Sequence, residues 1–356
     1  MRKPTKIEWH KEFQLGETPS FDDMRESVDP ARWKRVYQMS ALKNRFLIVD
    51  ENSRIFEPTR EQILDLAEQS ADWDQLLTTK TESEKQIATK IWNRDGSRAE
   101  NCGNGVRSLA TLEMFRAQDA NKPSASESFM EFNIRIDNDR PIETLCMVAP
   151  IKKSRSQSVR SEIDAGAMTH KKIIGTAPAH ILITQIIDGV KSAAEVSYGN
   201  PHLVLFLDDS TSPQKESLKG KKLEANLRDL SIPFYRHGVN ISFAQIRTDE
   251  AAIREMGDKA YARIDLQVWE RGAGLTESCS SGAVATYYAA CMQEQIKKIS
   301  RGNIFSAPHV ALKPLALEKD MPGNRDLNAF HAVAFDAKAF YLMGETLLER
   351  AGTLTL

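Results

Sequence analysis

The chain has 356 residues, which is too long for one ordinary hydrophobic core and suits two domains of roughly 150 residues each. It is 41% hydrophobic and 27% charged, and its net charge of −1 gives no reason to expect nucleic acid or a membrane as a partner. No apolar run approaches the ~20 residues of a membrane span, and the first residues lack the apolar core of a signal peptide, so we expect a cytoplasmic protein.

Residues 1–35 are polar and charged and follow no clean period, so they are interpreted as an N-terminal extension without assigned chemistry. At its end, Asp29 and Pro30 predict the start of a short helix in DPARWKRVYQ. The first strand is predicted at FLIVDE, residues 46–51, and Thr59 is placed to cap the helix after it.

Residues 72–80 have the composition of a strand, and a charged helix or loop is predicted between them and residue 90. The turn signature NRDGS, residues 93–97, then stands just before the sequence NCGNG. Residues 128–150 alternate apolar and polar side chains, which predicts two antiparallel strands around the turn NDRP. Residues 151–172 are rich in Lys, Arg and Ser and are the best candidate for a domain boundary.

The second half begins with two strand-like stretches, residues 179–190 and 193–209, followed by a loop and a helix over 211–230. Two more alternating strands, RHGVNISFAQIRT and ARIDLQVWERG, come next. In the second of them one face carries Ile264, Leu266 and Val268. The apolar tail, AVAFDAKAFYLMGETLLE, is placed to return and pair with the first domain.

Two stretches, NCGNGVRSLATLEMF and SCSSGAVATYYAACM, share one pattern: a cysteine, small residues with a glycine three places on, and an apolar run typical of a helix. The cysteines are Cys102 and Cys279, and 279 − 102 = 177 residues, about half the chain. A thiol at a helix N-terminus meets the positive end of the helix dipole and free backbone N–H groups, which lower its pKa toward neutrality. The pair therefore predicts two similar domains, each presenting a thiol able to act as a base or nucleophile.

The four cysteines suit neither a disulfide framework nor a metal site, because they are scattered and have no histidine at short ligand spacing. Cys146 and Cys291 are interpreted as small buried hydrophobes, the first within a strand and the second within an apolar helix. No dinucleotide-binding or P-loop motif is present, so we expect neither metal nor cofactor.

Five separated motifs, NRDGS with NCGNG, YGNPH, HGVN and ERGAGLTESCSSGA, stand in an order that resembles the diaminopimelate epimerase family. The resemblance covers most of residues 36–292. It implies a mixed α/β fold in which the strands are mostly antiparallel (α+β). It implies two pseudo-symmetric domains, each a strongly twisted, mostly antiparallel sheet or barrel around a central helix. After the extension 1–35, the first domain would comprise residues 36–150 together with strands at about 335–356. The second domain would comprise residues 151–334.

The family is an isomerase family that needs no pyridoxal phosphate, and the resemblance implies a two-base mechanism in a cleft between the domains. One cysteine, as thiolate, takes the α-proton of an amino acid, and the other, as thiol, delivers a proton to the opposite face. For LL-diaminopimelate the family assigns Cys102 as donor and Cys279 as acceptor. The product, meso-diaminopimelate, serves lysine and peptidoglycan precursor synthesis.

Further site residues carry over from the family one by one. Asn44 and Gln75 match positions that contact the substrate, and the carboxylate-binding positions are matched by Gly103, Asn104, Ser280 and Ser281. The distal end of the substrate would be held by Asn93, Asn200, Asn240 and Arg271. His202 and Glu270 match polar residues that tune the thiol pKa values, and Glu270 also matches a substrate-binding position.

Four positions depart from the family pattern, and they leave the substrate open. Lys43 and Arg45 add positive charge beside Asn44, Arg94 replaces a small residue, and Ser280 stands where glycine is usual. The alternatives are a racemase of another amino acid on the same fold and a non-catalytic ligand-binding homologue. A cysteine hydrolase is weaker, since it gives a second matched thiol no role. The expected partner is a small amino acid, and the oligomeric state, a homodimer included, stays open.

Overall fold

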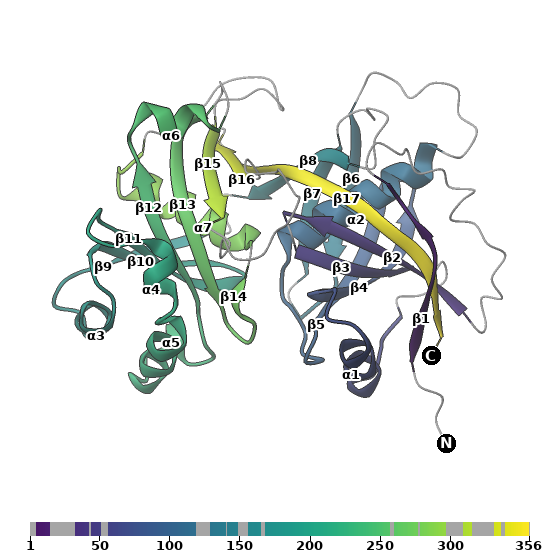
Figure 1. Cartoon of the computed structure of the whole chain (residues 1–356), viewed down its shortest axis with the longest axis horizontal. Coiled ribbons are helices and arrows are strands. Elements are labelled where there is room, and N and C mark those ends of the chain that lie inside the picture. The colour runs from purple at the N-terminus through teal and green to yellow at the C-terminus, as the bar shows by residue number, and fades with distance from the viewer. Residues whose placement is uncertain are drawn as a thin grey trace. The chain divides into compact units, whose positions relative to one another are not determined.

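The computed structural model describes residues 5–14, 33–42, 44–50, 56–118, 129–139, 141–148, 156–164, 168–256, 260–276, 278–296, 309–314, 331–335 and 339–355. The chain divides into two compact units (Figure 1). Unit 1 comprises Met1–Ser161 and Gly344–Leu356, and unit 2 comprises Glu162–Met343.

The described residues of unit 1 form two helices and a mostly antiparallel sheet. Its elements are β1 (Lys6–Glu12), β2 (Trp33–Ala41), β3 (Asn44–Asp50), α1 (Arg60–Gln69), β4 (Gln75–Ser83), β5 (Gln86–Asn93), α2 (Gly103–Gln118), β6 (Met130–Ile136), β7 (Ile142–Val148), β8 (Ser156–Asp164) and most of β17 (Ala339–Thr355). The strands are ordered β1-β17-β2-β3-β4-β5-β6-β7-β8, and the pairs β3–β4 and β5–β6 are parallel.

Unit 2 repeats this plan. Its elements are β9 (Thr169–Ile173), α3 (Pro178–Ile186), β10 (Val190–Tyr198), β11 (Asn200–Leu207), α4 (Pro213–Ser217), α5 (Gly220–Asp229), the short 3₁₀ helix η3 (Pro233–Tyr235), β12 (Asn240–Arg247), α6 (Glu250–Arg254), β13 (Ala260–Glu270), β14 (Gly274–Thr276), α7 (Ser280–Met292), β15 (His309–Pro314) and β16 (His331–Phe335). The order is β9-β10-β11-β12-β13-β15-β16 with the start of β17, and β11–β12 and β13–β15 are parallel. From β2 to β7 and from β10 to β16 the sequence of antiparallel and parallel pairings is the same.

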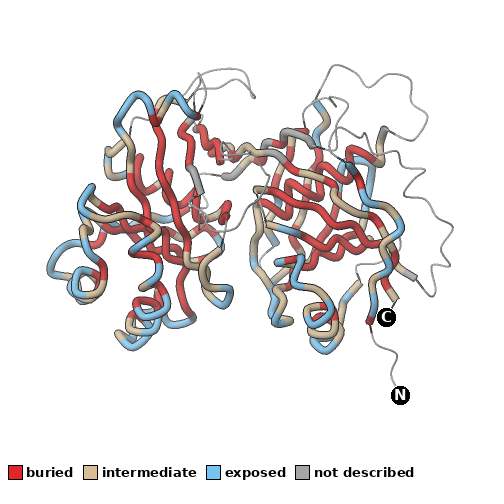
Figure 2. The backbone as a smooth tube through the Cα atoms, in the orientation of Figure 1, coloured by how far each residue is buried: buried red, intermediate tan, exposed pale blue. Residues whose placement is uncertain are grey.

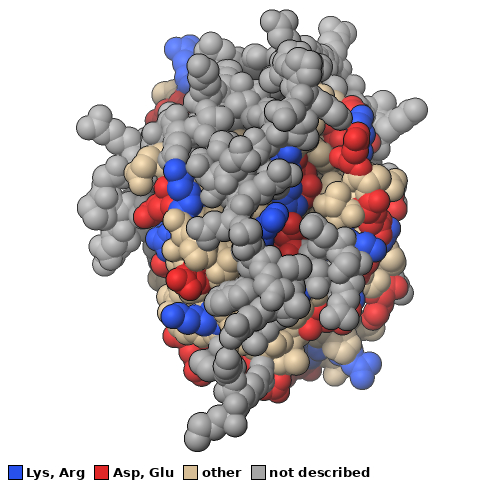
Figure 3. All heavy atoms as spheres, turned by 90° about the vertical axis from the view of Figure 1, so that its right-hand side faces the viewer, with Lys and Arg blue, Asp and Glu red and all other residues tan. Residues whose placement is uncertain are grey.

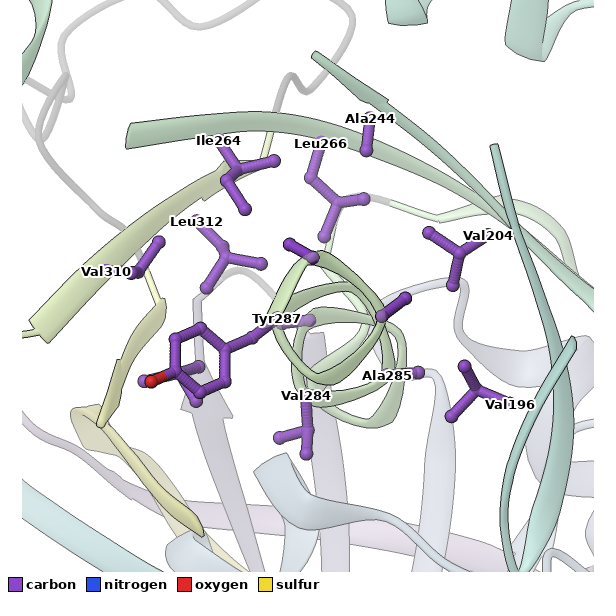
Figure 4. Close-up of a cluster of buried hydrophobic side chains, with 14 of the residues drawn as sticks. Val196, Val204, Ala244, Ile264, Leu266, Val284, Ala285, Tyr287, Val310 and Leu312 are labelled. Atoms are coloured by element: carbon purple, nitrogen blue, oxygen red, sulfur yellow. The ribbon is translucent and has the colours of Figure 1, made fainter. Parts of the chain in front are cut away.

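A buried helix lies at the centre of each unit. α7 is apolar on all sides, which is typical of a helix surrounded by protein. In Figure 4 its Val284, Ala285 and Tyr287 lie among side chains from the surrounding strands, such as Val204 and Leu266. α2 packs in the same way against apolar residues of β2 to β7. The predicted fold class, two similar twisted sheets each around a central helix, is therefore confirmed.

Exposed residues concentrate on the outer helices α1, α3 and α5, while the strands carry the buried residues (Figure 2). α1 begins where its sequence predicts: the Thr59 side chain accepts a hydrogen bond from the Gln62 N–H, and the Gln62 side chain accepts one from the Thr59 N–H. On the face drawn in Figure 3, Lys and Arg side chains lie among Asp and Glu side chains.

Three predicted elements are wrong. Residues 33–38, predicted as helix, belong to β2, because hydrogen bonds to β17 and β3 occupy both of its edges; Asp29 and Pro30 lie outside the described residues. Residues 86–93 form β5 between β4 and β6, in place of a charged helix or loop. The Ile-rich run at 179–190 forms α3, since Pro178 suits a first turn and Ala179 and Ile183, four residues apart, face the core together.

The remaining predicted strands of the described chain are present, including the pair β6–β7 and the strands β10 to β13. Ile264, Leu266 and Val268 share the buried face of β13, as their alternation predicts. The tail pairs with β2 of unit 1 through β17. The predicted boundary segment contains β8, and the division between the units falls after Ser161 within that strand.

Candidate active site

Each unit carries a cysteine directly before its central helix. In unit 1 the strand β5 ends at Asn93 and Cys102 follows nine residues later (102 − 93 = 9). In unit 2 the strand β13 ends at Glu270 and Cys279 also follows nine residues later (279 − 270 = 9). The two thiols are therefore equivalent in the fold as well as in the sequence pattern.

The sulfur atoms make the same contact in both units. The Cys102 Sγ accepts a hydrogen bond from the Gly105 N–H at 3.3 Å, and the Cys279 Sγ accepts one from the Gly282 N–H at 3.4 Å. Each sulfur thus takes the place of an N-cap oxygen, where the helix dipole and the N–H stabilise a negative charge. Ser281 Oγ lies 3.5 Å from the Cys279 Sγ.

Glycine is needed at the third position after each cysteine because the sulfur approaches the helix backbone closely. A Cβ atom on Gly105 would lie 3.3 Å from the Cys102 Sγ, and one on Gly282 would lie 3.3 Å from the Cys279 Sγ. The glycines of the two motifs therefore make room for the thiols.

In unit 1 the predicted amide residues lie along one edge of the sheet, the edge formed by the starts of β3 and β4 and the end of β5. Asn44 begins β3, Gln75 begins the parallel strand β4, and Asn93 ends β5 opposite Gln75. Gln75 Nε2 donates to Asn93 Oδ1 at 2.9 Å, and Asn104 Nδ2 donates to Asn44 Oδ1 at 2.6 Å. The Asn104 amide connects this edge directly to the first turn of α2.

Three of the four residues predicted for the distal end of a substrate meet at one edge of unit 2, while the fourth, Asn93, lies in unit 1. Gly199, with φ of +69°, turns the chain so that Asn200 begins β11, and Asn240 begins the parallel strand β12. The Arg271 backbone N–H donates to Asn240 Oδ1 at 3.0 Å, and its Nη2 donates to Asn200 Oδ1 at 3.2 Å. Asn200 thus holds the guanidinium of Arg271, which is only partly buried, and Asn240 holds its backbone.

The two edges are built with the same register. The residue two positions after Asn44 pairs with Gln75, and the residue two positions after Asn200 pairs with Asn240. The sequence predicts the individual residues, and the strand pairing explains why they come in equivalent sets.

His202 is completely buried on β11, and neither ring nitrogen has a hydrogen-bond partner within the described residues. Burial, with a smaller contribution from the Arg271 charge, lowers the His202 pKa to about 3, so the imidazole is neutral at physiological pH. The other expected tuning residue, Glu270, accepts a hydrogen bond from Thr276 Oγ1 at 2.5 Å.

One departure from the family pattern has a structural explanation. The Arg94 guanidinium stacks over the Trp73 ring at 4.8 Å, and its two Nη atoms donate to the backbone oxygens of Trp73 and Ala67 at 2.7 Å each. These contacts fasten the turn after β5 to the end of α1. Arg94 is therefore occupied away from the thiol.

The other departures have different surroundings. Arg45 is about half exposed and forms ion pairs with Asp72 and Glu349, both at 3.6 Å. Ser280 is buried, and its Oγ has no hydrogen-bond partner within the described part of the chain. Lys43 lies outside the described residues.

Arg107 was not predicted as a site residue. It lies in α2 with no exposed surface, and its Nη2 donates to Asn104 Oδ1. A single cation in the run VRSLATLEMF, whose pattern is that of a buried helix, is the signal in the sequence that points to it.

The helices of the described chain include none that is long and apolar enough to cross a membrane. Within the same residues no group of three or more His, Cys, Asp and Glu side chains could hold a metal ion.

The family described as "Diaminopimelate epimerase" matches residues 36–129. The diaminopimelate epimerase of Phenylobacterium zucineum (strain HLK1) is 29% identical over 260 residues, 71% of this chain and 80% of its own length. That of Alkalilimnicola ehrlichii is 28% identical over 297 residues, 82% of this chain and 88% of its own length.

Among solved structures, a hydroxyproline epimerase from Agrobacterium vitis with bound trans-4-OH-L-proline aligns with a TM-score of 0.55 at 10% identity, covering 91% of this chain and 93% of that chain. A phenazine biosynthesis protein of the PhzF family from Bacillus anthracis aligns with a TM-score of 0.55 at 12% identity, covering 91% and 100%. At these identities the two structures support the fold.

The fold and the sequence relatives together define the class of protein: it is an isomerase of the epimerase and racemase type. Within this class, the resemblance to the diaminopimelate epimerase family that the five motifs carry is confirmed.

Proposed function

We propose that the protein converts LL-diaminopimelate to meso-diaminopimelate by a two-base mechanism that uses Cys102 and Cys279 and no pyridoxal phosphate. The observation that carries the proposal is the equivalence of the two thiols, each nine residues after a strand end and each on the N–H of a glycine in the first turn of a buried helix. The substrate is inferred from the names of the sequence relatives.

The reaction moves one proton in and one proton out. A thiolate takes the α-proton and becomes a thiol, and the electron pair of the broken C–H bond is shared with the substrate carboxylate. The other thiol gives its proton to the opposite face of the carbon and becomes a thiolate. A two-thiol enzyme therefore changes form with each turnover, and the reverse reaction exchanges the two roles.

The α-proton of an amino acid is weakly acidic, so negative charge on the carboxylate must be stabilised as it develops. The backbone N–H groups of Gly103 with Asn104 and of Ser280 with Ser281 stand at helix N-termini, where they can bind that charge. Removing water from the site strengthens these interactions.

The distal end of the substrate would be recognised by amides and one cation. Arg271 would pair with the distal carboxylate, while Asn200 and Asn240 hold its guanidinium and backbone. In the other unit, Asn44, Gln75 and Asn93 offer amide donors and acceptors along one edge. His202, which is neutral, and Glu270 would tune the pKa of the Cys279 thiol in unit 2.

The test is deuterium incorporation at the α-carbon of LL-diaminopimelate in heavy water, followed by proton NMR. We expect loss of the α-proton signal together with formation of the meso product. Cys102→Ser and Cys279→Ser should each slow the reaction by roughly 10²–10⁴-fold, the contribution of a positioned acid or base. Cys291→Ser, on the same helix as Cys279 but outside the proposed chemistry, is the matched control and should leave the rate unchanged.

A racemase of another amino acid is the second candidate. The buried Ser280 hydroxyl, which has no hydrogen-bond partner among the described residues, favours it, because it narrows the carboxylate cradle and offers a polar contact. A panel of L-amino acids in the same exchange assay separates the two. Exchange with another amino acid and none with diaminopimelate would replace the first candidate. Tight binding without exchange of any α-proton would instead identify a ligand-binding homologue. The cytoplasmic location and the homodimer stay predictions of the sequence.

A further inference from the structure

Arg107 is a cation without exposed surface in the second turn of α2. A side chain on a helix points back toward the helix N-terminus, and here the Arg107 Nη2 reaches the Asn104 side chain one turn earlier. Its Nε and Nη1 have no hydrogen-bond partner within the described residues. Nη1 lies against β17, where a Cβ atom on Gly344 would come within 2.9 Å of it.

A buried guanidinium with unfilled donors is costly in free energy, and it is retained more often where its charge has a use. Burial lowers the Arg107 pKa to about 10, so the side chain still carries its charge at neutral pH. Two cysteines of the described chain, Cys146 and Cys102, oppose this lowering: a thiolate at either one would raise the Arg107 pKa.

Only one of these thiols can supply the negative charge. Cys146 is completely buried on β7, and burial raises its pKa to about 12, so it stays protonated at neutral pH. Cys102 is half-buried at the helix N-terminus, where its sulfur already accepts the Gly105 N–H.

The charged groups that form ion pairs with α2 within the described residues lie at its far end. Asp50 of β3 lies 2.9 Å from Arg116, and Arg116 also stacks over the Tyr37 ring of β2 and pairs with Glu113. The residues of β6 in this core, Phe132 and Ile134 among them, are apolar. From β17, Thr346 meets Thr111 of α2 through their hydroxyls.

Unit 2 lacks an equivalent cation. Arg107 stands five residues after Cys102, and the residue five places after Cys279 is Val284, which is buried in the apolar core around α7. In Figure 4 Val284 projects from α7 between Tyr287 and Ala285. The two thiols therefore make the same backbone contact, but the helix after Cys102 carries a buried cation where the helix after Cys279 carries a valine.

We propose that Arg107 is a positioning residue that makes the two thiols unequal: its buried charge favours the thiolate at Cys102 over that at Cys279, and its side chain orients the Asn104 amide. The resting protein then holds Cys102 mainly as thiolate and Cys279 mainly as thiol. In the family's assignment of roles this is the form that takes the α-proton of the meso isomer, so LL-diaminopimelate reacts with the less populated form. The inference rests on the proposed function only where it assigns these thiols to proton transfer.

The first measurement needs no variant and no substrate. Alkylation of the folded protein by iodoacetamide is followed from pH 5 to pH 10 by mass spectrometry of the Cys102 and Cys279 peptides. We expect the Cys102 rate to rise at a lower pH than the Cys279 rate, by about one pH unit or more, the usual effect of an opposite charge nearby. A Cys279 profile at the same or a lower pH would overturn the proposal.

Three variants then separate charge from structure. Arg107→Gln keeps a donor for Asn104 and removes the charge, so alkylation of Cys102 at pH 7 should slow about tenfold. Arg107→Lys keeps the charge and should retain the wild-type profile. Arg116→Gln removes another mostly buried cation from the same helix and should leave the Cys102 profile in place. An unshifted profile in folded Arg107→Gln, or an equal shift in Arg116→Gln, contradicts the proposal.

The two proposals can fail separately. If Cys102 is alkylated at lower pH than Cys279, as expected, but no α-proton is exchanged, the proposed reaction is overturned and the role of Arg107 stands. Exchange that depends on both cysteines, with identical alkylation profiles, would do the reverse. If Arg107→Gln does not fold, as judged by circular dichroism, the comparison of the two thiols in the wild-type chain still decides.

Discussion

His202 couples the stability of unit 2 to pH through its burial. The unfolded chain binds a proton at this imidazole below its ordinary pKa of 6.5, whereas the folded protein does not until about pH 3. Stability contributed by the neutral imidazole is therefore full above pH 6.5 and is lost as the pH falls toward 3, by about 1.4 kcal/mol of unfolding free energy per pH unit.

The prediction is that His202→Phe, which places an aromatic ring where the register of unit 1 has Phe46, reduces the loss of stability between pH 7 and pH 4. Urea unfolding at the two pH values should show a loss smaller than that of the wild type by roughly 3 kcal/mol. His237→Gln, which removes an exposed imidazole, is the control. An equal pH dependence in wild type and His202→Phe would contradict the burial of an unprotonated ring.

At the scale of residues, the structure brings together several side chains that the motifs single out. Asn44 with Asn104, Gln75 with Asn93, and Asn200 with Arg271 and Asn240 are each brought together. The roles of these residues stay predictions. Arg107 escapes because its burial depends on β17, an element far away in the sequence that passes close to its Nη1.

At the scale of elements, a substitution in the first turn of α7 should change activity and stability differently. A methyl group on Gly282 would lie 3.3 Å from the Cys279 Sγ and 3.1 Å from Val268 Cγ2, so the sulfur must retreat from the N–H that it accepts. We expect Gly282→Ala to lower kcat about tenfold, since small misplacements of a reacting group are costly.

The same substitution should hardly lower the melting temperature, because alanine favours a helix over glycine by up to about 1 kcal/mol. Gly175→Ala, where an added Cβ meets nothing within 4 Å, is the control for both measurements. The prediction is wrong if kcat is unchanged, or if kcat falls only together with the folded fraction.

The strands β6 and β7 are predictable from alternation, because every second residue is buried. β3 is predictable from its compact apolar run, which is buried on both faces. Two of the three wrong elements share a cause. The residues of β2 favour a helix in isolation, and only its hydrogen bonds to β17 and β3 make it a strand. The isoleucines of α3 favour a strand, and only the packing of Ala179 and Ile183 makes it a helix. Tertiary contacts decide in both directions.

At the scale of the whole molecule, residues 344–356 belong to unit 1 although unit 2 precedes them in the chain. β17 lies between β1 and β2, so removing these residues leaves both strands without that partner. We predict that a chain ending at Met343 keeps unit 2 folded while unit 1 opens at β2.

Hydrogen–deuterium exchange checks this prediction. Amides of β2 and β3 should lose their protection in the shortened chain, and those of β11 to β13 should keep it. The exposed edge of β2 should also make the shortened chain aggregate at lower concentration than the full chain. Equal loss of protection in both units would show that they do not fold separately.

The place of β17 also has a consequence for the order of events at the ribosome. Residues 162–343 emerge as one continuous stretch, so unit 2 can fold while the nascent chain is still growing. Residues 1–161 emerge earlier but must wait for residues 344–356 before β2 gains its neighbour. The half of the protein that is synthesised first, with Cys102 and Arg107, is therefore the half that is completed last.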